Sequence, residues 1–239
     1  TPVTLIMSPL DDLCKENSLP ENVKYLLNLA HNNTRKLHEL ITKLLDFERV
    51  DTFRQNLKLN SIDLNDMLAE EIAGFQSICD KKQLHLSLSL PESEVYIVSD
   101  KSMLSMLLDN LISNACKYTK ANGTVKVSLS VNNRKAIISV EDTGIGIPKR
   151  EQKKIFNEVF RAENVGNTKE IGTGFGLLQV NRIVNMLNGE IKFESQENRG
   201  SKFTITFKRV DEKPDEKDRI TIVQRESEEI THTLGKEDL

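Results

Sequence analysis

The sequence is poor in several residue types, and each shortage removes a class of protein. Its 239 residues include no tryptophan, three cysteines, 11 glycines and six prolines, a composition that excludes collagen-like and low-complexity chains. No apolar run approaches the roughly 18 residues of a membrane-spanning helix, and no signal-peptide pattern opens the sequence. The cysteines, Cys14, Cys79 and Cys116, are widely spaced and form no CxxC pair, which favours reduced thiols over a disulfide framework or a zinc site.

An excess of positive charge is also absent. The net charge is −3, and residues 209–239 alone carry 10 acidic and six basic side chains. The remaining chain is therefore almost neutral and lacks the basic surface that nucleic-acid binding requires. Because residues 209–239 contain few apolar side chains, we interpret them as a charged C-terminal linker. We expect neither a nucleic-acid partner nor a membrane segment in this chain.

Residues 1–55 have the apolar periodicity of two helices. Apolar side chains recur at intervals of three and four from Val3 to Leu13, and the pattern resumes after Pro20. The second stretch follows the a and d positions of four heptads: Val23, Leu26, Ala30, Asn33, Leu37, Leu40, Leu44 and Phe47. We therefore predict a helical hairpin whose narrow apolar seam is covered by a second hairpin in a dimeric four-helix bundle. Packing of that seam on the downstream domain of the same chain is the alternative.

Residues 56–208 alternate between helical and strand patterns. Asp63 and Asp100 each precede an amphipathic stretch and are predicted helix caps, and the strict alternation from Leu84 to Leu90 predicts a strand. The other predicted elements are strands at 95–98, 125–131, 137–140, 191–193 and 203–207, a short helical piece at 155–160 and a helix at 175–187. Helices that bracket mostly antiparallel strands predict an α+β two-layer sandwich.

The end of the helix predicted after Asp100 carries four polar side chains on one face. Asn110, Asn114, Lys117 and Tyr118 are separated by four, three and one residues, so they lie close together on the helix surface. Two carboxamides, an ammonium group and a phenol can hold a hydrated Mg²⁺ ion, phosphate oxygens and an aromatic base. Taken alone, this face is equally compatible with an ordinary polar helix surface.

Glycine-punctuated segments supply the other candidate site residues. Asp142, Gly144, Gly146 and Ile147 follow a strand, where a carboxylate can accept a hydrogen bond from an amine and glycine backbone can approach a ligand ring. A second segment leads into a helix, whose free N–H groups favour phosphate; it consists of Gly172, Thr173, Gly174, Phe175, Gly176 and Leu177. Ser201, at the start of the last strand, offers a further hydroxyl to phosphate.

In this order and spacing, these segments resemble the ATP-binding domain of histidine kinases, a branch of the GHKL (Bergerat-fold) ATPases. Residues 110–119 resemble the N box of that family, residues 142–147 the G1 box, residues 155–161 the F box and residues 172–177 the G2 box. The resemblance implies Mg-ATP as cofactor, with Asp142 on the adenine amine and Tyr118 against the ring. It places Asn110 and Asn114 at the metal and Lys117 at the phosphates. Residues 146–172 would form a mobile lid, from which Lys169 or Arg161 steadies the phosphates.

The hairpin resembles the dimerisation and histidine-phosphotransfer domain of the same family. Residues 1–6 match the tail of its H box, in which the phosphoacceptor histidine lies four residues before the threonine. We therefore expect that histidine upstream of residue 1, and Thr1 takes the place of the residue that orients water in the family's phosphatase reaction. His38 repeats the His-Glu dipeptide of the H box, but the Thr-Pro sequel does not follow it.

The resemblance implies that the γ-phosphoryl group of ATP passes to histidine and then to an aspartate of a response-regulator receiver domain, either separate or C-terminal in a hybrid kinase. It also implies a cytoplasmic location, as the soluble portion of a membrane-anchored sensor. One alternative is a GHKL ATPase, but those enzymes have a glutamate where this sequence has Asn110, and a carboxamide cannot act as a general base at neutral pH. The other alternative is a degenerate kinase that serves as a dimeric scaffold.

Overall fold

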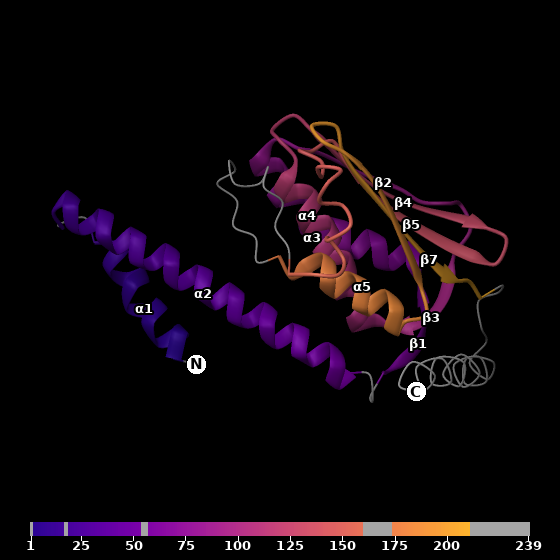
Figure 1. The fold of residues 1–239 in the computed structure, drawn as a ribbon, viewed down its shortest axis with the longest axis horizontal. Coiled ribbons are helices and arrows are strands. Elements are labelled where there is room, and N and C mark those ends of the chain that lie inside the picture. The colour runs from indigo at the N-terminus through magenta and orange to yellow at the C-terminus, as the bar shows by residue number, and fades with distance from the viewer. Residues whose placement is uncertain (1, 17–18, 54–56, 160–173, 211–239) are drawn as a thin grey trace.

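The computed structural model describes residues 2–16, 19–53, 57–159 and 174–210. Two helices in the predicted positions, α1 (Pro2–Cys14) and α2 (Glu21–Phe53), form an antiparallel hairpin (Figure 1). The end that carries α1 lies apart from the rest of the chain, whereas α2 also contacts α5 (Gly176–Met186). His31 Nε2 lies 2.6 Å from Asp11 Oδ1 and joins the two helices. None of the described helices is both long enough and apolar enough to cross a membrane.

The buried face of α2 follows the predicted seam only in part. Val23 of the seam is half-buried, and so are Leu27 and His31, which lie beside the seam; His31 contacts α1. Further along the seam, Leu26 is 60% exposed and Leu37 is 49% exposed. Part of the predicted seam therefore stays in contact with water. The side chains of Leu40, Leu44 and Phe47 lie outside the described ones.

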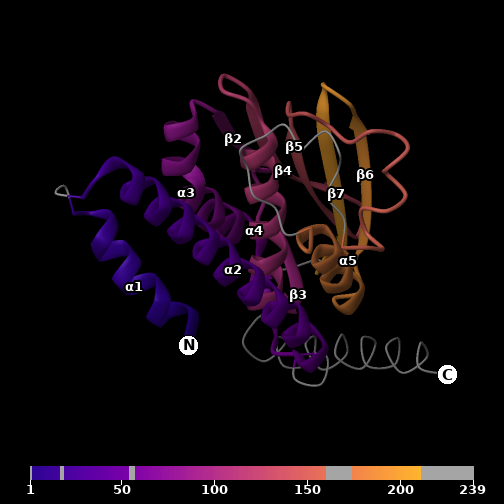
Figure 2. The ribbon, with the colours of Figure 1, turned by 60° about the vertical axis from the view of Figure 1, so that its left-hand side comes forward.

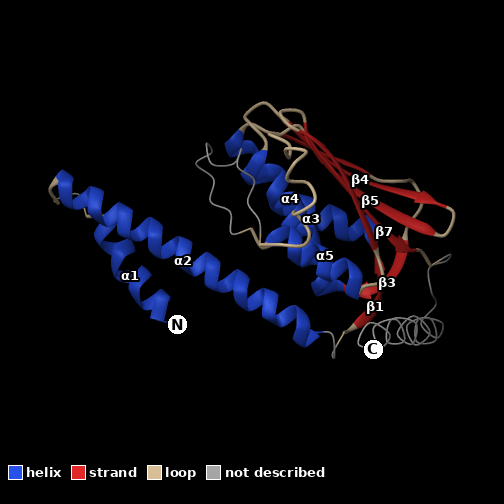
Figure 3. Cartoon of the chain, viewed as in Figure 1, coloured by secondary structure: helices blue, strands red, loops and turns tan. Residues whose placement is uncertain are grey.

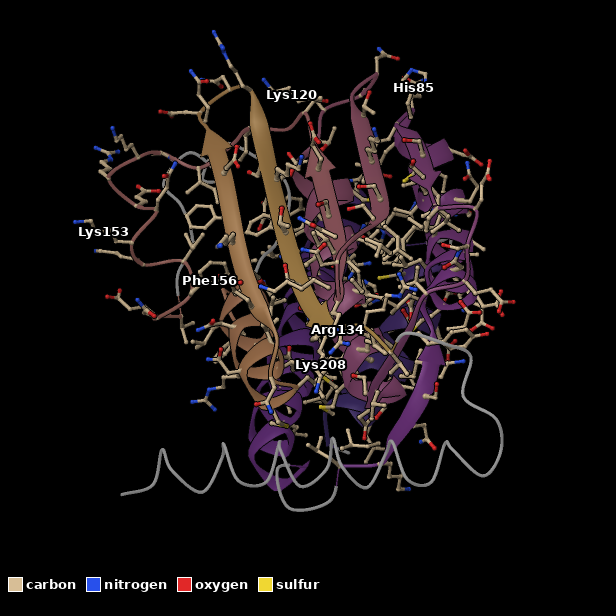
Figure 4. All side chains as sticks on the ribbon, turned by 90° about the vertical axis from the view of Figure 1, so that its right-hand side faces the viewer. His85, Lys120, Arg134, Lys153, Phe156 and Lys208 are labelled. Carbon is tan, nitrogen blue, oxygen red and sulfur yellow. The ribbon has the colours of Figure 1, made fainter. Side chains whose placement is uncertain are left out.

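The rest of the chain is built on a five-stranded mixed sheet with the order β2-β4-β5-β7-β6. The strands are β2 (His85–Ser89), β4 (Thr124–Asn132), β5 (Lys135–Asp142), β6 (Glu190–Gln196) and β7 (Gly200–Lys208). Strands β2 and β4 run parallel, and all other neighbours in this sheet are antiparallel. Figure 4 looks onto the face of this sheet that the helices leave uncovered.

Three helices cover the other face of the sheet: α3 (Leu64–Lys82), α4 (Lys101–Tyr118) and α5 (Gly176–Met186) (Figures 2 and 3). In β4, buried Val125, Val127 and Leu129 alternate with more exposed polar residues, as expected of a sheet with one covered face. The core lies between these two layers, and its fully buried members include Leu104, Leu107 and Leu108 of α4. The predicted α+β two-layer sandwich is confirmed.

Both predicted aspartate caps are present. Asp63 accepts hydrogen bonds from the backbone N–H groups of Asn65 and Asp66, and Asp100 accepts from those of Ser102 and Met103. Each satisfies N–H groups that a helix N-terminus leaves without intrahelical partners. Asp100 Oδ2 also accepts from the Lys58 backbone N–H at 2.8 Å. The cap of α4 therefore also fastens the segment by which the chain enters the domain.

Two parts of the fold differ from the prediction. Strand β3 (Tyr96–Asp100) does not join the main sheet but pairs with β1 (Leu59–Asp63), a strand that was not predicted because it has little apolar alternation. Val210 extends this small sheet through a bridge to Tyr96. The predicted helical piece at 155–160 is wrong over its described residues. Residues 149–159 form successive turns, with hydrogen bonds from Glu151 N to Pro148 O and from Lys154 N to Glu151 O.

Candidate functional site

The four polar residues predicted on one face lie in the C-terminal half of α4. Asn110 is buried, whereas Asn114, Lys117 and Tyr118 are half-buried. The Lys117 Nζ atom lies 5.5 Å from the centroid of the Tyr118 ring, which places an ammonium group over an aromatic face. The helix therefore presents carboxamides near its middle and a cation and a phenol at its end.

The start of α5 meets the two asparagines. A Cβ atom added to Gly176 would lie 3.0 Å from Asn110 Oδ1 and 3.4 Å from Asn114 Nδ2. Glycine at this position therefore lets the first turn of α5 approach both carboxamides. Because the N-terminus of a helix carries partial positive charge and free N–H groups, the contact joins an anion-binding element to the asparagine face.

Asn110 is held by a residue that the sequence prediction missed. Its Nδ2 atom donates to Met106 O at 2.8 Å and to Gln179 Oε1 of α5 at 3.2 Å. Gln179 is only 3% exposed, and its Nε2 atom lies 2.8 Å from Met106 Sδ. A polar residue at a helix position next to Val180 and Ile183, both fully buried, was the signal that could have identified it.

Asp142, at the end of β5, is the other chemically distinctive group. Its Oδ1 atom accepts from the Gly144 backbone N–H at 2.8 Å. Burial raises the pKa of Asp142 to about 6, although hydrogen bonds from the backbone of Gly144 and Ser201 act in the opposite direction. A desolvated carboxylate has a strong preference for a hydrogen-bond donor, because pairing recovers part of the interaction lost with water.

The loop that follows Asp142 is fastened on both sides. Ile145 N donates to Tyr118 O at the end of α4, and Ile147 N donates to the Ser195 hydroxyl of β6. A Cβ atom on Gly144 would lie 2.6 Å from Tyr118 O, and one on Gly146 would lie 2.0 Å from Gln196 O. These glycines therefore allow the loop to pack closely against the protein's own backbone.

Ser201 lies at the Asp142 end of the candidate site. It lies opposite Asp142 in the β5–β7 register and is 8% exposed, and its hydroxyl lies 2.9 Å from that of Ser195. Because β5 and β7 are neighbouring strands, their pairing holds Ser201 beside Asp142. Ser201 therefore supports Asp142 and the loop through Ser195, and its hydroxyl is already engaged.

The sequence prediction also missed two residues, Gln152 and Ser195, that hold the loop after Asp142. Gln152 Nε2 donates to Ile147 O and to Ser195 O, at 3.0 and 2.9 Å. Ser195 lies two residues after Phe193 in β6, so the two side chains lie on the same face of the strand. A hydroxyl on the face that carries Phe193 was a signal that could have identified Ser195 from the sequence. Nothing in the sequence marks Gln152, because its role depends on a turn that packs against β6. Figure 4 places the neighbouring Phe156 beside β6, where its ring lies edge-on to Phe193 at a centroid distance of 5.4 Å.

The described part of the chain thus brings together most of the predicted site. Gly174, Phe175 and Leu177 are half-buried around the start of α5, and Gly174 has a positive φ of 81° that suits glycine. The remaining predicted residues lie outside the described ones: Thr1, Arg161, Lys169, Gly172 and Thr173. Helix α4 joins the two parts of the candidate site: its asparagines contact the start of α5 at Gly176, and its last residue, Tyr118, accepts a hydrogen bond from the loop after Asp142.

Comparison with known proteins agrees with this geometry. Residues 99–211 match the family described as histidine kinase-, DNA gyrase B-, and HSP90-like ATPases. Sensor histidine kinase YcbM of Bacillus subtilis is 26% identical over 211 residues, which cover 88% of this chain and 68% of YcbM. Hybrid signal transduction histidine kinase D of Dictyostelium discoideum is 30% identical over 210 residues, which cover 86% of this chain and 14% of that protein.

Among solved structures, full-length ShkA in complex with AMPPNP superposes with a TM-score of 0.65 at 21% identity, over 86% of this chain and 44% of ShkA. The chain spans less than half the length of ShkA and of the Dictyostelium kinase. The match over residues 99–211 supports an ATPase domain of the GHKL type. Together with the relatives that are named sensor histidine kinases, it supports a histidine kinase catalytic domain, as the resemblance predicted.

Proposed function

We propose that this chain binds Mg-ATP and transfers its γ-phosphoryl group to a histidine, as part of a two-component sensor kinase. The observation that carries the proposal is the convergence of Asn110 and Asn114 on Gly176 at the start of α5. This arrangement suits a nucleotide-bound cation, because neutral carboxamide oxygens can complete the coordination of an ion whose charge is balanced by phosphates.

The residues divide the nucleotide between two ends of the site. Asp142 would accept a hydrogen bond from the exocyclic amine of adenine, and Tyr118 would lie against the ring. Asn110 and Asn114 would hold Mg²⁺, which screens the phosphate charge, and Lys117 would contact phosphate oxygens. Because Asn110 cannot accept a proton at neutral pH, the site favours transfer to a positioned nucleophile over activation of water.

In the transfer, a neutral imidazole nitrogen forms a bond to the γ-phosphorus while the bond to the ADP oxygen breaks, and ADP leaves with the electron pair. The accepting histidine is the one predicted upstream of residue 1. The phosphoryl group then passes to an aspartate of a receiver domain, which is a separate protein or a later part of a hybrid kinase. The name of the Dictyostelium relative is consistent with the hybrid arrangement.

Thermal unfolding tests the nucleotide site directly. A ligand at about 100 times its dissociation constant adds about 2.7 kcal/mol to stability, so we expect ATP with Mg²⁺ to raise Tm and ATP without Mg²⁺ to raise it less. GTP is the matched control, because it presents a carbonyl oxygen to Asp142 where ATP presents an amine. Equal rises in Tm with both nucleotides would contradict the role of Asp142. No rise in Tm with either nucleotide would favour the alternative in which the chain is a degenerate kinase that serves as a dimeric scaffold.

We further propose that the hairpin forms the homodimer. Support comes from the exposure of Leu26 and Leu37, two positions of the predicted seam on α2. A dimer through this seam would remove both side chains from water. Light scattering on the purified chain tests this directly, and a monomer mass at micromolar concentration would contradict it.

A further inference from the structure

We propose that Gln179 is a positioning residue for the metal ligand Asn110. This inference rests on the proposed function and concerns how the chain prepares its cation site before nucleotide arrives. Gln179 lies in the second turn of α5, behind Gly176, and reaches across to the middle of α4. The juxtaposition of two buried carboxamides from different helices carries the argument.

The hydrogen bonds determine which way each carboxamide points. Met106 O can only accept, so the Asn110 atom at 2.8 Å from it is the amide nitrogen. That nitrogen has two hydrogens, and the second goes to Gln179 Oε1 at 3.2 Å. Both donors of Asn110 are therefore used inside the protein, and its oxygen faces the other way.

The oxygen of Asn110 faces the start of α5, since a Cβ atom on Gly176 would lie 3.0 Å from it. In the described part of the chain, no hydrogen bond is made to this oxygen. A flip of the carboxamide would set its oxygen against Met106 O and Gln179 Oε1, two acceptors, and would turn its NH₂ group toward the site. Gln179 therefore selects the rotamer that presents an oxygen, the atom type that Mg²⁺ requires.

Gln179 is itself held in one orientation. It is 3% exposed, its Oε1 atom receives the Asn110 hydrogen, and its Nε2 atom is directed at Met106 Sδ, 2.8 Å away. Exchanging its nitrogen and oxygen would set two donors against each other at Asn110. The three side chains thus form a closed arrangement in which α5 orients a residue of α4, and groups behind the ligands of a metal commonly tune its affinity in this way.

The test compares nucleotide affinity with and without Mg²⁺ in a double-mutant cycle. Gln179→Leu removes the acceptor, and we expect the factor by which Mg²⁺ tightens ATP binding to fall about tenfold, because loss of an orienting group typically costs 10–100-fold in metal affinity. Binding of Mg-free ATP should stay within about twofold. In an Asn110→Ala background, Gln179→Leu should have no further effect on Mg²⁺ dependence.

Two controls separate positioning from general damage. Gln179→Glu keeps an acceptor oxygen and should retain most of the Mg²⁺ effect, whereas Asn181→Leu removes a carboxamide from the same helix at a different contact and should retain all of it. A direct readout is the side-chain amide of Asn110 in nucleotide-free protein. Its hydrogen exchange, followed by NMR, should accelerate in Gln179→Leu and stay slow in Asn181→Leu.

The outcomes distinguish this inference from the proposed function. If wild-type protein shows no Mg²⁺-dependent ATP binding, the proposed function fails and this inference fails with it. If wild type responds to Mg²⁺ and Gln179→Leu responds equally, only the role of Gln179 is wrong. A Gln179→Leu defect that is the same with and without Mg²⁺, or that persists in the Asn110→Ala background, would also overturn it.

Discussion

Replacement of Asp142 by asparagine should stabilise the nucleotide-free protein while it weakens ATP binding. Burial raises the pKa of Asp142 from 3.8 to about 6, so the folded state resists ionisation of this carboxyl more than the unfolded state does. Between these two values the folded state binds more protons, and stability falls as the pH rises. Above about pH 6, Asp142 is ionised in the folded state, and the folded protein carries the full free-energy cost of that buried charge.

The magnitude follows from the shift. One pKa unit corresponds to 1.36 kcal/mol, so a shift from 3.8 to about 6 sets an upper limit of about 3 kcal/mol on the cost. Water that reaches this partly accessible carboxylate screens the charge, so we expect a gain of about 1–2 kcal/mol for Asp142→Asn at pH 7.5. At about 2–4 °C per kcal/mol, the Tm should rise by several degrees. The asparagine oxygen can still accept from Gly144 N–H, so the turn is preserved.

Nucleotide binding should change in the opposite direction. The amide of asparagine would set a donor against the adenine amine, and hydrogen bonds to charged groups contribute about 1.5–3 kcal/mol, so ATP affinity should fall at least tenfold. In wild type, the ATP-dependent rise in Tm should shrink as the pH falls from 7.5 to 5, because protonated Asp142 is a poorer acceptor. The measurement is Tm against pH with and without Mg-ATP.

Glu194→Gln is the matched control, because it removes an exposed carboxylate from β6 without touching the site. It should change neither the nucleotide-free stability nor the ATP effect by more than a few tenths of a kcal/mol. A nucleotide-free Asp142→Asn protein that is less stable than wild type at pH 7.5 would refute the reasoning. A wild-type Tm that responds to pH between 4 and 6.5 no differently from that of Asp142→Asn would refute it equally.

Three further outcomes follow from described contacts. Asn114→Ala should reduce the Mg²⁺-dependent gain in ATP affinity about tenfold or more and leave Mg-free binding almost unchanged; equal losses in both conditions, measured by titration calorimetry, would remove it from the metal site. Lysine at both Leu26 and Leu37 should convert a dimer to a monomer by light scattering, and an unchanged mass would place the interface elsewhere. Gly200→Ala should destabilise the fold by about 2–5 kcal/mol, because the added Cβ would lie 1.9 Å from Asp142 O and the backbone φ at this position is 115°. Gly74→Ala is the matched control: no atom lies close to the added Cβ, so the free energy of unfolding should rise by about 0.5–1 kcal/mol. Similar Tm values for the two variants would contradict this contrast.

Periodicity and capping predicted most of the fold. The alternation from Leu84 to Leu90 marks β2, and Asp63 and Asp100 begin α3 and α4 as expected, because these signals arise within one element. Strand β1 escaped prediction because its stability depends on pairing with β3 rather than on its own side-chain pattern. The helical piece predicted at 155–160 failed because apolar spacing alone does not separate a helix from successive turns anchored by Phe156.

The candidate site shows the same division. Asn110 and Asn114 could be placed on one face from their spacing, and Gly176 could be placed at the start of α5. Contacts between distant segments could not be inferred from local pattern. The pairing of Ser201 with Asp142 depends on the register of β5 and β7, and the bond between Gln179 and Asn110 depends on the packing of α5 against α4.

The two described ends of the domain meet in the small β1–β3 sheet. The chain enters through β1, whose Asp63 lies opposite Tyr96, and it leaves at Val210, which bridges to the same Tyr96. A torque delivered by the hairpin would first reach Lys58 and, through its hydrogen bond to Asp100, the N-terminus of the helix that carries the asparagine pair. The entrance of the domain is thus directly bonded to the helix whose other half forms the asparagine face of the candidate site.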